Sequence, residues 1–503
     1  MNPNPYLTSE PKTETHSDDF ESVRKEIVGH DQCITTPYGT FPLIYLDWTA
    51  SGRLYKPIED KIQNIFGPYI ANTHTETNTT GTVMTKAYHQ AKRIIKEHVG
   101  ASQDDVVIFS GTGMTGAINK FQRILGLKIP HSLLGHFDFK NQEKPLVLIS
   151  HMEHHSNHTS WLETLADVVI IPPGADGLFS IAQFKQTLKE HAHRTLKYVS
   201  ITSCSNVTGI RIPYHEVASI IHKEGGYCFV DFACSGPYVD IDMHPTSDPL
   251  AYLDAIFLSP HKFLGGPGTS GVLIFNRALY NNAIPDQPGG GTVKYTSPWD
   301  PHVYIDDIEE REDGGTPGFI QAIRTALAVK LKEKMQPQKM LQKEHAMIAY
   351  LFNELGSVEG LHILAPEHRD RLGVFSFYIE SMHYNLVVKL LNDRFGIQTR
   401  GGCSCAGTYG HYLLHIDRPF SLSIKSEIEK GNIFMRPGWV RLSIHPTTTW
   451  DELKTAVKAI KELVIHRDLW SRDYEYNPNN NSYDHILHQS NTEDEVVQAG
   501  FSL

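Results

Sequence analysis

The chain has 503 residues, of which 40% are hydrophobic and 20% charged, and its formal net charge is -11. This length allows two domains with a large core, and the acidic balance argues against nucleic acid or an anionic membrane as the main partner. No stretch reaches the length of a transmembrane helix, the polar start lacks the apolar core of a signal peptide, and six cysteines do not indicate a disulfide framework. We therefore expect a cytoplasmic protein in a reducing compartment.

The first hundred residues hold short structured elements between polar segments. Residues 1–30 are polar, and residues 45–51 (Tyr-Leu-Asp-Trp-Thr-Ala-Ser) indicate a strand and a turn. Apolar residues at helical spacing predict helices over residues 57–66 and 82–99. The segment Asn72-Thr-His74 between them is polar, and its sequence alone does not distinguish it from a surface loop.

A predicted buried strand over residues 106–110 runs into the turn Gly111-Thr-Gly-Met114-Thr115-Gly and then a helix. Glycines let the backbone approach an anion, and the free amides of a helix start point toward it. Thr115 adds a hydroxyl. We expect an anion site at this turn, although such turns are common in α/β proteins. Residues 127–144 are polar and predict a surface insertion.

Four histidines follow the next predicted strand, residues 146–150, in the run His151-Met-Glu-His154-His155-Ser-Asn-His158. His154 and His158 stand four residues apart, which makes a metal site one interpretation. The His-Glu-x-x-His order of zinc peptidases is absent, so metal is the minor interpretation and we expect none.

The middle of the chain continues with predicted strands over residues 168–171, 197–203 and 226–231. Asn206 follows the second of them in the run Asn-Val-Thr-Gly. The third ends in Asp231, with Cys234 three residues later. A strand-end aspartate that caps the next turn is the structural interpretation of Asp231.

Two apolar runs within residues 254–275 flank Ser259-Pro-His261-Lys262 and a glycine-rich turn. Neither run alternates polar with apolar residues, so both predict buried strands. Lys262 would then sit at a strand end. A partly buried lysine has a lowered pKa, and its neutral amine can attack a carbonyl, as a Schiff-base lysine must. An ordinary lysine in a turn between strands is the alternative.

The chain then changes character toward a second domain. Three glycines at 289–291 and the run Gly-Gly-Thr316-Pro precede a predicted helix over residues 318–335. Residues 373–378 alternate as a half-exposed strand would, and residues 385–395 predict a helix. Beyond residue 467 the sequence is polar, which indicates a tail.

Arg400-Gly-Gly-Cys403-Ser-Cys405 forms a predicted flexible loop with two thiols. With His411 the cysteines offer three metal ligands, but no second ligand pair stands at suitable spacing. Structural thiols are a further alternative. Arg441 lies on the last predicted strand, and its planar fork suits a carboxylate, with Arg400 as the second candidate.

Taken in order, these motifs resemble the class V aminotransferase-like family of fold-type I enzymes that use pyridoxal 5'-phosphate (PLP). Within it, the cysteine desulfurases and selenocysteine lyases are most similar, and the resemblance runs from about residue 45 to about residue 463. It implies an α/β fold with a mostly parallel mixed sheet in a large domain and a small α+β domain. The expected divisions are a polar segment at 1–30, the PLP-binding domain at 31–317, the small domain at 318–467 and a polar tail at 468–503.

The resemblance implies a role for most of the candidate residues. Lys262 would carry the cofactor, His154 would stack on its ring, Asn206 would bond its ring hydroxyl and Asp231 would keep its ring nitrogen protonated. Further cofactor contacts are implied for Met114, Thr115, Ser259, His261 and Cys234. Thr316 would reach the phosphate of the partner subunit's cofactor, which implies a homodimer. Cys234 departs from the pattern, since desulfurases usually have glutamine there. Molybdenum-cofactor sulfurases also lack that glutamine, and they share the long segment between residues 409 and 441.

Counting from Arg400, the family's catalytic cysteine falls on Cys405, and Cys403 stands where relatives have histidine or serine. Asn72 and His74 match the family's Asn-x-His segment near the substrate, and Arg441 and Arg400 its carboxylate site.

The resemblance implies removal of sulfur, or selenium, from a small amino acid, cysteine or selenocysteine, through a persulfide passed to an acceptor protein. A class V aminotransferase, another lyase or an epimerase is the alternative; the cysteine loop disfavours it and Cys234 mildly favours it. A catalytically silent protein on this fold is the third, against which Lys262, His154 and Asp231 count.

Overall fold

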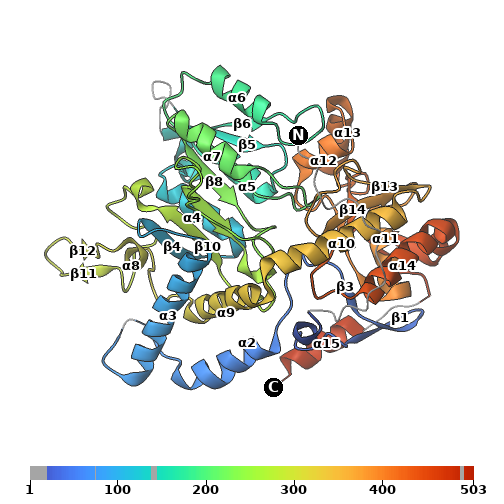
Figure 1. Cartoon of the computed structure of the whole chain (residues 1–503), viewed down its shortest axis with the longest axis horizontal. Coiled ribbons are helices and arrows are strands. Elements are labelled where there is room, and N and C mark those ends of the chain that lie inside the picture. The colour runs from blue at the N-terminus through green and yellow to red at the C-terminus, as the bar shows by residue number, and fades with distance from the viewer. Residues whose placement is uncertain (1–19, 74, 137–143, 488–491, 503) are drawn as a thin grey trace.

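The computed structural model describes residues 20–73, 75–136, 144–487 and 492–502. Figure 1 shows two parts, a large domain built on a central sheet and a small domain, in orange and red, that holds a second sheet. The predicted α/β class with a large and a small domain is confirmed.

The central sheet has seven strands in the order β4-β10-β9-β8-β7-β5-β6. Strands β5 to β9 run parallel, and β10 runs antiparallel to both of its neighbours, β9 and β4. The strands comprise β4 (Asp105–Ser110), β5 (Leu146–Ser150), β6 (Asp167–Ile171), β7 (Lys197–Thr202), β8 (Tyr227–Asp231), β9 (Ala255–Leu258) and β10 (Gly271–Asn276). All seven coincide with apolar runs of the sequence to within a residue or two.

Helices cover both faces of this sheet, as a mostly parallel sheet requires. Residues of α4 (Gly113–Ile124) and α5 (His155–Leu162) share one buried apolar cluster with one face. Residues of α3 (Thr79–His98), α6 (Ile181–Glu190) and α7 (Tyr214–Lys223) share another cluster with the opposite face. The predicted helices over 82–99 and after the glycine turn are both present.

The small domain is a four-stranded antiparallel sheet in the order β13-β14-β17-β16. Its strands are β13 (Leu361–Ile363), β14 (Val374–Ile379), β17 (Trp439–Ser443) and β16 (Arg400–Gly402). The helices that pack on it are α10 (Pro337–Leu355), α11 (Tyr384–Phe395) and α14 (Trp450–Trp470). An early strand, β3 (Ile44–Tyr45), joins this domain by pairing in parallel with β15 (Ile397–Gln398). The residues that follow β3 are therefore carried to the domain boundary.

Smaller elements complete the chain. Helix α9 (Phe319–Met335) packs against α3 and leads into the small domain. The remaining α-helices and strands are α1 (Glu21–Arg24), β1 (Cys33–Thr36), β2 (Gly39–Pro42), α2 (Lys56–Lys61), β11 (Val293–Tyr295), β12 (Val303–Tyr304), α8 (Ile308–Arg311), α12 (Gly407–Leu413), α13 (Arg418–Glu429), β18 (Tyr474–Asn477), β19 (Ser482–His485) and α15 (Thr492–Phe501).

Two local expectations differ from the structure. Strand β14 is not half-exposed: Phe375 and Phe377 lie in the small-domain core, while Ser376 donates from Oγ to the carbonyl oxygen of Val207 in the large domain, 2.6 Å away. The large domain thus covers the face that the alternation assigned to solvent. Part of the predicted tail forms the hairpin of β18 and β19, in which Tyr474 is buried and donates to Asp393 Oδ2 at 2.9 Å.

The first described residues are partly buried. Phe20 and Ile27, within the segment predicted to be polar, are buried in an apolar cluster beside α9. Within the described ranges, no helix combines the length and the apolarity needed to cross a bilayer.

Candidate active site

A cavity of about 240 Å³ opens at the carboxyl ends of the parallel strands, where α/β sheets bind their ligands. Most of the residues singled out in the sequence line it, although they come from segments spread over more than 300 positions. These are Met114, Thr115, His154, Asn206, Asp231, Cys234, Ser259, His261, Lys262, Arg400, Cys405 and Arg441.

Lys262 ends a short 3-10 turn, Pro260–Lys262, directly after β9. The backbone N–H of Lys262 donates to the carbonyl oxygen of Ser259 at 3.0 Å, which fixes the turn. Burial lowers the pKa of the Lys262 amine, and the nearby acidic groups of Cys234 and Asp231 oppose this only in part. The amine is therefore more readily neutral than that of a surface lysine, as the sequence predicted.

Asp231 is the last residue of β8 and is almost fully buried. Its Oδ1 accepts a 2.7 Å hydrogen bond from the N–H of Ala233, and no other donor to this carboxylate occurs within the described chain. Burial raises the pKa of Asp231 to about 6, against the effects of Ala233 and of the Lys262 charge. A buried carboxylate with one unoccupied oxygen at a cavity wall suits a protonated ring nitrogen.

His154 caps the N-terminus of α5 with its own ring, since Nδ1 accepts from the N–H of Ser156 at 3.1 Å. Burial, with the positive charge of Lys262, lowers the pKa of His154 to about 3. The imidazole is therefore neutral at physiological pH, with its proton on Nε2. A neutral flat ring in a cavity wall can stack on another aromatic ring.

The start of α4 forms a cradle of small and polar groups. The Met114 N–H donates to Ser259 Oγ at 2.8 Å, and Thr115 Oγ1 lies 2.6 Å from Ser156 Oγ. Thr112, the N-cap residue, makes no side-chain capping bond, so first-turn amides other than that of Met114 keep donors for an anion. Gly113 has a φ of +57°, and a Cβ there would stand 2.7 Å from His261 Cε1, so this position requires glycine.

Cys405 lies on a loop that the large domain holds in place. The N–H of His155 donates to the carbonyl oxygen of Cys405 at 2.7 Å, and Asn206 Nδ2 donates to that of Ser404 at 2.7 Å. Ser404 and Cys405 both have left-handed φ angles, +51° and +56°, which cost energy for residues other than glycine. Cys405 is exposed and lines the cavity, whereas Cys403 is half-buried and does not line it.

Arg441 and Arg400 line the cavity from the small domain. Arg441 donates from Nη2 to Asp47 Oδ1 at 2.9 Å and from Nη1 to the carbonyl oxygen of Asn206 at 3.2 Å. Arg400 donates from Nε to Asp47 Oδ2 at 3.0 Å. The side-chain amide of Asn206 thus bonds the cysteine loop, and its backbone carbonyl bonds Arg441.

Cys234 has a buried thiol neighbour that the sequence gave no reason to single out. Cys204 also lines the cavity, and the sulfur atoms of both residues lie 3.6 Å from the carbonyl oxygen of Ser205. A hydrogen bond with Cys204 lowers the pKa of the Cys234 thiol, and the charge of Lys262 acts in the same direction.

Two predicted residues, Thr316 and Asn72, lie outside this cavity. Thr316 is exposed and accepts from Asn72 Nδ2 at 3.4 Å, and neither residue lines the cavity. His74 lies outside the described residues.

Three of the histidines that offered a metal interpretation bond other residues. His155 Nε2 accepts from the N–H of Gly407 at 3.0 Å, and His158 Nδ1 lies 3.2 Å from Thr408 Oγ1. His411 bonds the carbonyl of Gly407 and Ser421 Oγ. In the described part of the chain, no three metal-binding side chains gather.

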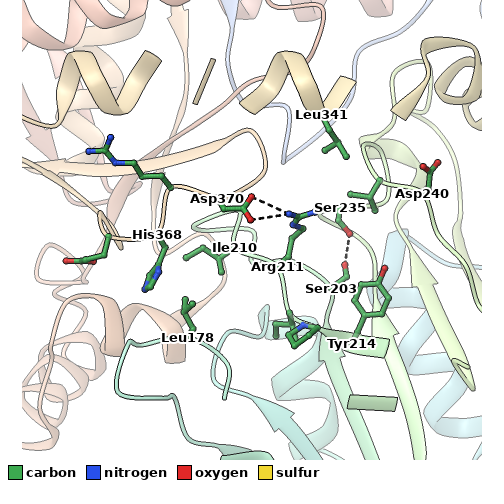
Figure 2. Close-up of a pocket in the computed structure, with 15 residues that line it drawn as sticks. Leu178, Ser203, Ile210, Arg211, Tyr214, Ser235, Asp240, Leu341, His368 and Asp370 are labelled. Atoms are coloured by element: carbon green, nitrogen blue, oxygen red, sulfur yellow. Dashed lines mark hydrogen bonds and ion pairs between the residues drawn. The ribbon is translucent and has the colours of Figure 1, made fainter. Parts of the chain in front are cut away.

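A second, larger cavity of about 770 Å³ is lined by a different set of residues (Figure 2). Residues that line it form the Arg211–Asp370 ion pair, at 3.3 Å, and the Ser203–Ser235 hydrogen bond, at 2.5 Å. Ser203 and Ser235, which line this cavity, directly precede or follow Cys204 and Cys234, which line the first, in sequence. None of the predicted site residues lines this second cavity.

The aminotransferase class-V family model matches residues 44–455, most of the chain. The chain belongs to the class-V aminotransferase family. A probable cysteine desulfurase of Halalkalibacterium halodurans is 30% identical over 373 residues, which cover 73% of this chain and 84% of that protein. One from Staphylococcus aureus is 28% identical over 395 residues, or 78% of this chain and 89% of that protein.

Two solved structures illustrate the similarity of fold. The apo cysteine desulfurase of Thermococcus onnurineus has a TM-score of 0.71 at 22% identity, covering 88% of this chain and 98% of that one. The Escherichia coli cysteine desulfurase CsdA has a TM-score of 0.65 at 20% identity, covering 84% of this chain and 94% of that one. These likenesses confirm fold-type I.

The cofactor of this class-V family is PLP, and the cavity fits it. The start of α4 lines the cavity without a side-chain cap, so its first-turn amides suit a phosphate. The second oxygen of Asp231 takes no donor within the described chain, and Lys262 forms no ion pair there. An anion cradle, a neutral imidazole, an amine and a buried carboxylate in one cavity match the groups of this cofactor.

Sequence reasoning did not assign roles to several residues that hold this site together. Asp47 was noted only as part of a strand motif, and His155 only as part of the histidine run. Ser156 and Cys204 gave no signal, since a serine in a helix start and a cysteine in a strand end are common. Their contacts depend on segments distant in sequence.

Proposed function

We propose that this class-V enzyme removes sulfur from L-cysteine and leaves L-alanine, with Cys405 as the sulfur-accepting nucleophile. The observation that carries the proposal is the placement of Cys405: an exposed thiol on a loop that lines the same cavity as Lys262 and is bonded to His155 and Asn206. The similarity to proteins named probable cysteine desulfurases supports the same reaction.

PLP, when bound, acts as an electron sink for the bond that breaks at the substrate. Asp231 would hold a proton at the ring nitrogen, because it lines the cavity and its Oδ2 takes no donor within the described chain. His154, neutral and capping α5, would cover one face of the ring and exclude water from it.

Lys262 would carry the cofactor between turnovers and then move protons at the substrate α-carbon. Its lowered pKa makes the free amine more available as a base than that of a surface lysine. Ser259, which precedes the lysine turn and bonds the start of α4, and His261, which lies within the turn beside Gly113, would hold the phosphate.

Cys405 as thiolate would attack the sulfur atom of the substrate. A bond forms between the two sulfur atoms, the carbon–sulfur bond breaks, and its electron pair stays with the carbon fragment. That fragment takes up protons and leaves as alanine, while Cys405 carries the persulfide. A thiol or an acceptor protein then takes the outer sulfur atom.

The substrate carboxylate would bind at Arg400 and Arg441. Arg441 is buried, and both of its terminal amino groups already have acceptors, whereas Arg400 is half-exposed and uses only Nε. The two terminal amino groups of Arg400 therefore remain available to the substrate carboxylate, and Arg441 adds its positive charge at the same cavity.

A homodimer forms part of the proposal. Thr316 and Asn72 bond each other on an exposed surface outside this chain's own cavity, as residues that complete a partner's site would. We also propose that the large domain comprises residues 31–317 and the small domain residues 318–467. Disruption of the dimer by Thr316→Arg should lower cofactor affinity, measured by titration alongside sedimentation.

A second candidate is transamination, which Cys234 favours, because a thiol is a weak hydrogen-bond partner where desulfurases have glutamine. The deciding experiment is a panel of amino acids scored for sulfide, keto acid and alanine. We expect sulfide and alanine in equal amounts from cysteine in the presence of a reductant. Keto acid without sulfide would establish the second candidate instead.

A further inference from the structure

Asp47 lies between the two arginines of the carboxylate site and bonds both. Its Oδ1 accepts from Arg441 Nη2 at 2.9 Å, and its Oδ2 accepts from Arg400 Nε at 3.0 Å. Asp47 is 8% exposed and does not itself line the cavity. It therefore acts on a ligand through the two guanidinium groups.

The two arginines stand side by side because of strand register. Arg400 on β16 and Arg441 on β17 are direct partners in an antiparallel pair. Like charges directly opposite each other destabilise a sheet. The compensating carboxylate comes from the segment after β3, which Thr49 anchors by donating its N–H to Ser443 Oγ at 3.0 Å. Asp47 also forms a parallel bridge with Ser443.

The three side chains together carry one net positive charge at the cavity wall. Arg441 Nε is buried and has no acceptor within the described residues, and the terminal amino groups of Arg400 have none there either. The arginines thus keep donors for one more anion. Because Asp47 neutralises one guanidinium, a second anionic group would find no charge left to pair with it.

We propose that Asp47 is a specificity-determining residue, which sets the carboxylate site at one net positive charge and limits the substrate to amino acids with one carboxylate and an uncharged side chain. This rests on the proposed function, in which these arginines bind the substrate carboxylate. Dicarboxylic amino acids are disfavoured because Asp47 already pairs with both guanidinium groups, so their second carboxylate finds no unpaired positive charge at this site.

The test measures binding of amino acids to the PLP-loaded protein through changes in its visible absorption. L-Alanine and L-aspartate serve as the one-carboxylate and two-carboxylate probes. We expect the wild type to bind alanine at least about ten-fold more tightly than aspartate, and Asp47→Asn to lower that ratio by about ten-fold or more, chiefly through tighter aspartate binding.

Charge-matched variants separate this role from a structural one. Asp47→Glu keeps the charge and should keep the ratio. The double variant Asp47→Asn with Arg400→Gln restores one net positive charge and should recover the preference for alanine. Asp370→Asn removes an acidic partner of Arg211 in the second cavity (Figure 2) and should leave the ratio unchanged.

Equal weakening of both probes by Asp47→Asn would overturn the proposal, since a structural role predicts it. A wild type that binds aspartate as tightly as alanine would do so as well. If Asp47→Asn does not fold, Arg400→Gln alone decides: an improved ratio of aspartate to alanine binding contradicts the proposal. None of these measurements uses sulfide release, so a failure of the proposed desulfurase reaction would be seen separately in the amino-acid panel.

Discussion

The backbone N–H of His155 donates a 2.7 Å hydrogen bond to the carbonyl oxygen of Cys405. The residue next to His154 therefore holds the loop of the proposed nucleophile, and the imidazole of His155 adds a second bond by accepting from the N–H of Gly407 at 3.0 Å. Large and small domains meet at this point, so the position of Cys405 depends on both.

We expect His155→Ala to slow persulfide formation on Cys405 by about ten-fold or more, because a loop displaced by about 1 Å loses its reacting geometry. Binding of PLP should remain, since His155 does not line the cavity. The measurement is single-turnover persulfide formation, followed by mass spectrometry. His155→Gln, whose side-chain oxygen can accept from Gly407, should recover part of the rate; an unchanged rate in His155→Ala would show that the loop needs no such support.

Cys405→Ser should bind L-cysteine, with a change in the cofactor spectrum, and release sulfide at least about 100-fold more slowly, because a serine hydroxyl is a poor nucleophile toward sulfur. Cys403→Ser is the matched control and should lose only a few-fold, since Cys403 does not line the cavity. The persulfide should appear on the peptide at Cys405. Its appearance at Cys403 instead would move the assignment by two residues.

Lys262→Ala should lose the visible band of the covalently held cofactor while its circular dichroism stays that of the wild type. Within the described residues, Lys262 is the lysine that lines the cavity. Lys56→Ala, at an exposed lysine paired with Asp60, is the control and should keep the band. A cofactor that can still be fixed to the variant by borohydride would refute the assignment.

Asp231→Asn should retain bound PLP, because the α4 cradle is untouched and an amide oxygen can still accept from Ala233. Turnover should fall by about 100-fold or more, since an amide does not stabilise a protonated ring nitrogen. Cofactor affinity and turnover are measured on the same preparation. A variant that turns over at nearly the wild-type rate would place the role of Asp231 elsewhere.

Glu344 on α10 predicts a pH effect on stability. It is fully buried, with Oε2 accepting from the N–H of Gly373 at 3.1 Å and Oε1 without a donor among the described residues. Burial raises its pKa from 4.5 to about 8. Between these values the folded state binds more protons than the unfolded state, so stability falls as pH rises, by up to about 1.4 kcal/mol per pH unit.

Glu344→Gln removes this loss, so its Tm relative to the wild type should rise steadily from pH 5 to pH 8. Glu354→Gln, at a half-exposed glutamate on the same helix, is the control and should show a smaller trend. Tm by differential scanning at several pH values provides the measurement. A Tm difference independent of pH would mean that Glu344 is ionised in the folded protein.

Much of the fold follows from local sequence. The apolar runs that became β4 to β10 lack alternation because the sheet is covered on both faces, and this property is visible without neighbours. The turn at Gly113 and the lysine at the end of β9 could also be predicted, because turns, helix starts and strand ends are set by residues that are neighbours in sequence. Strand β14 was misjudged because its second face is covered by Val207, a residue from the other domain.

The contacts that complete the site are of another kind. Asp47 meets Arg441 across 394 positions of sequence, and Asn206 meets Ser404 across 198. Strand order and side-chain direction decide such contacts, and neither leaves a local pattern. The sequence by itself determined which chemical groups stand at strand ends and in which order. The tertiary structure decided that His155 holds the Cys405 loop, that Cys204 adjoins Cys234, and that Asp47 shares its charge between two arginines. The reason is that hydrogen bonds and ion pairs form only between groups that the packing of distant segments brings within about 3 Å.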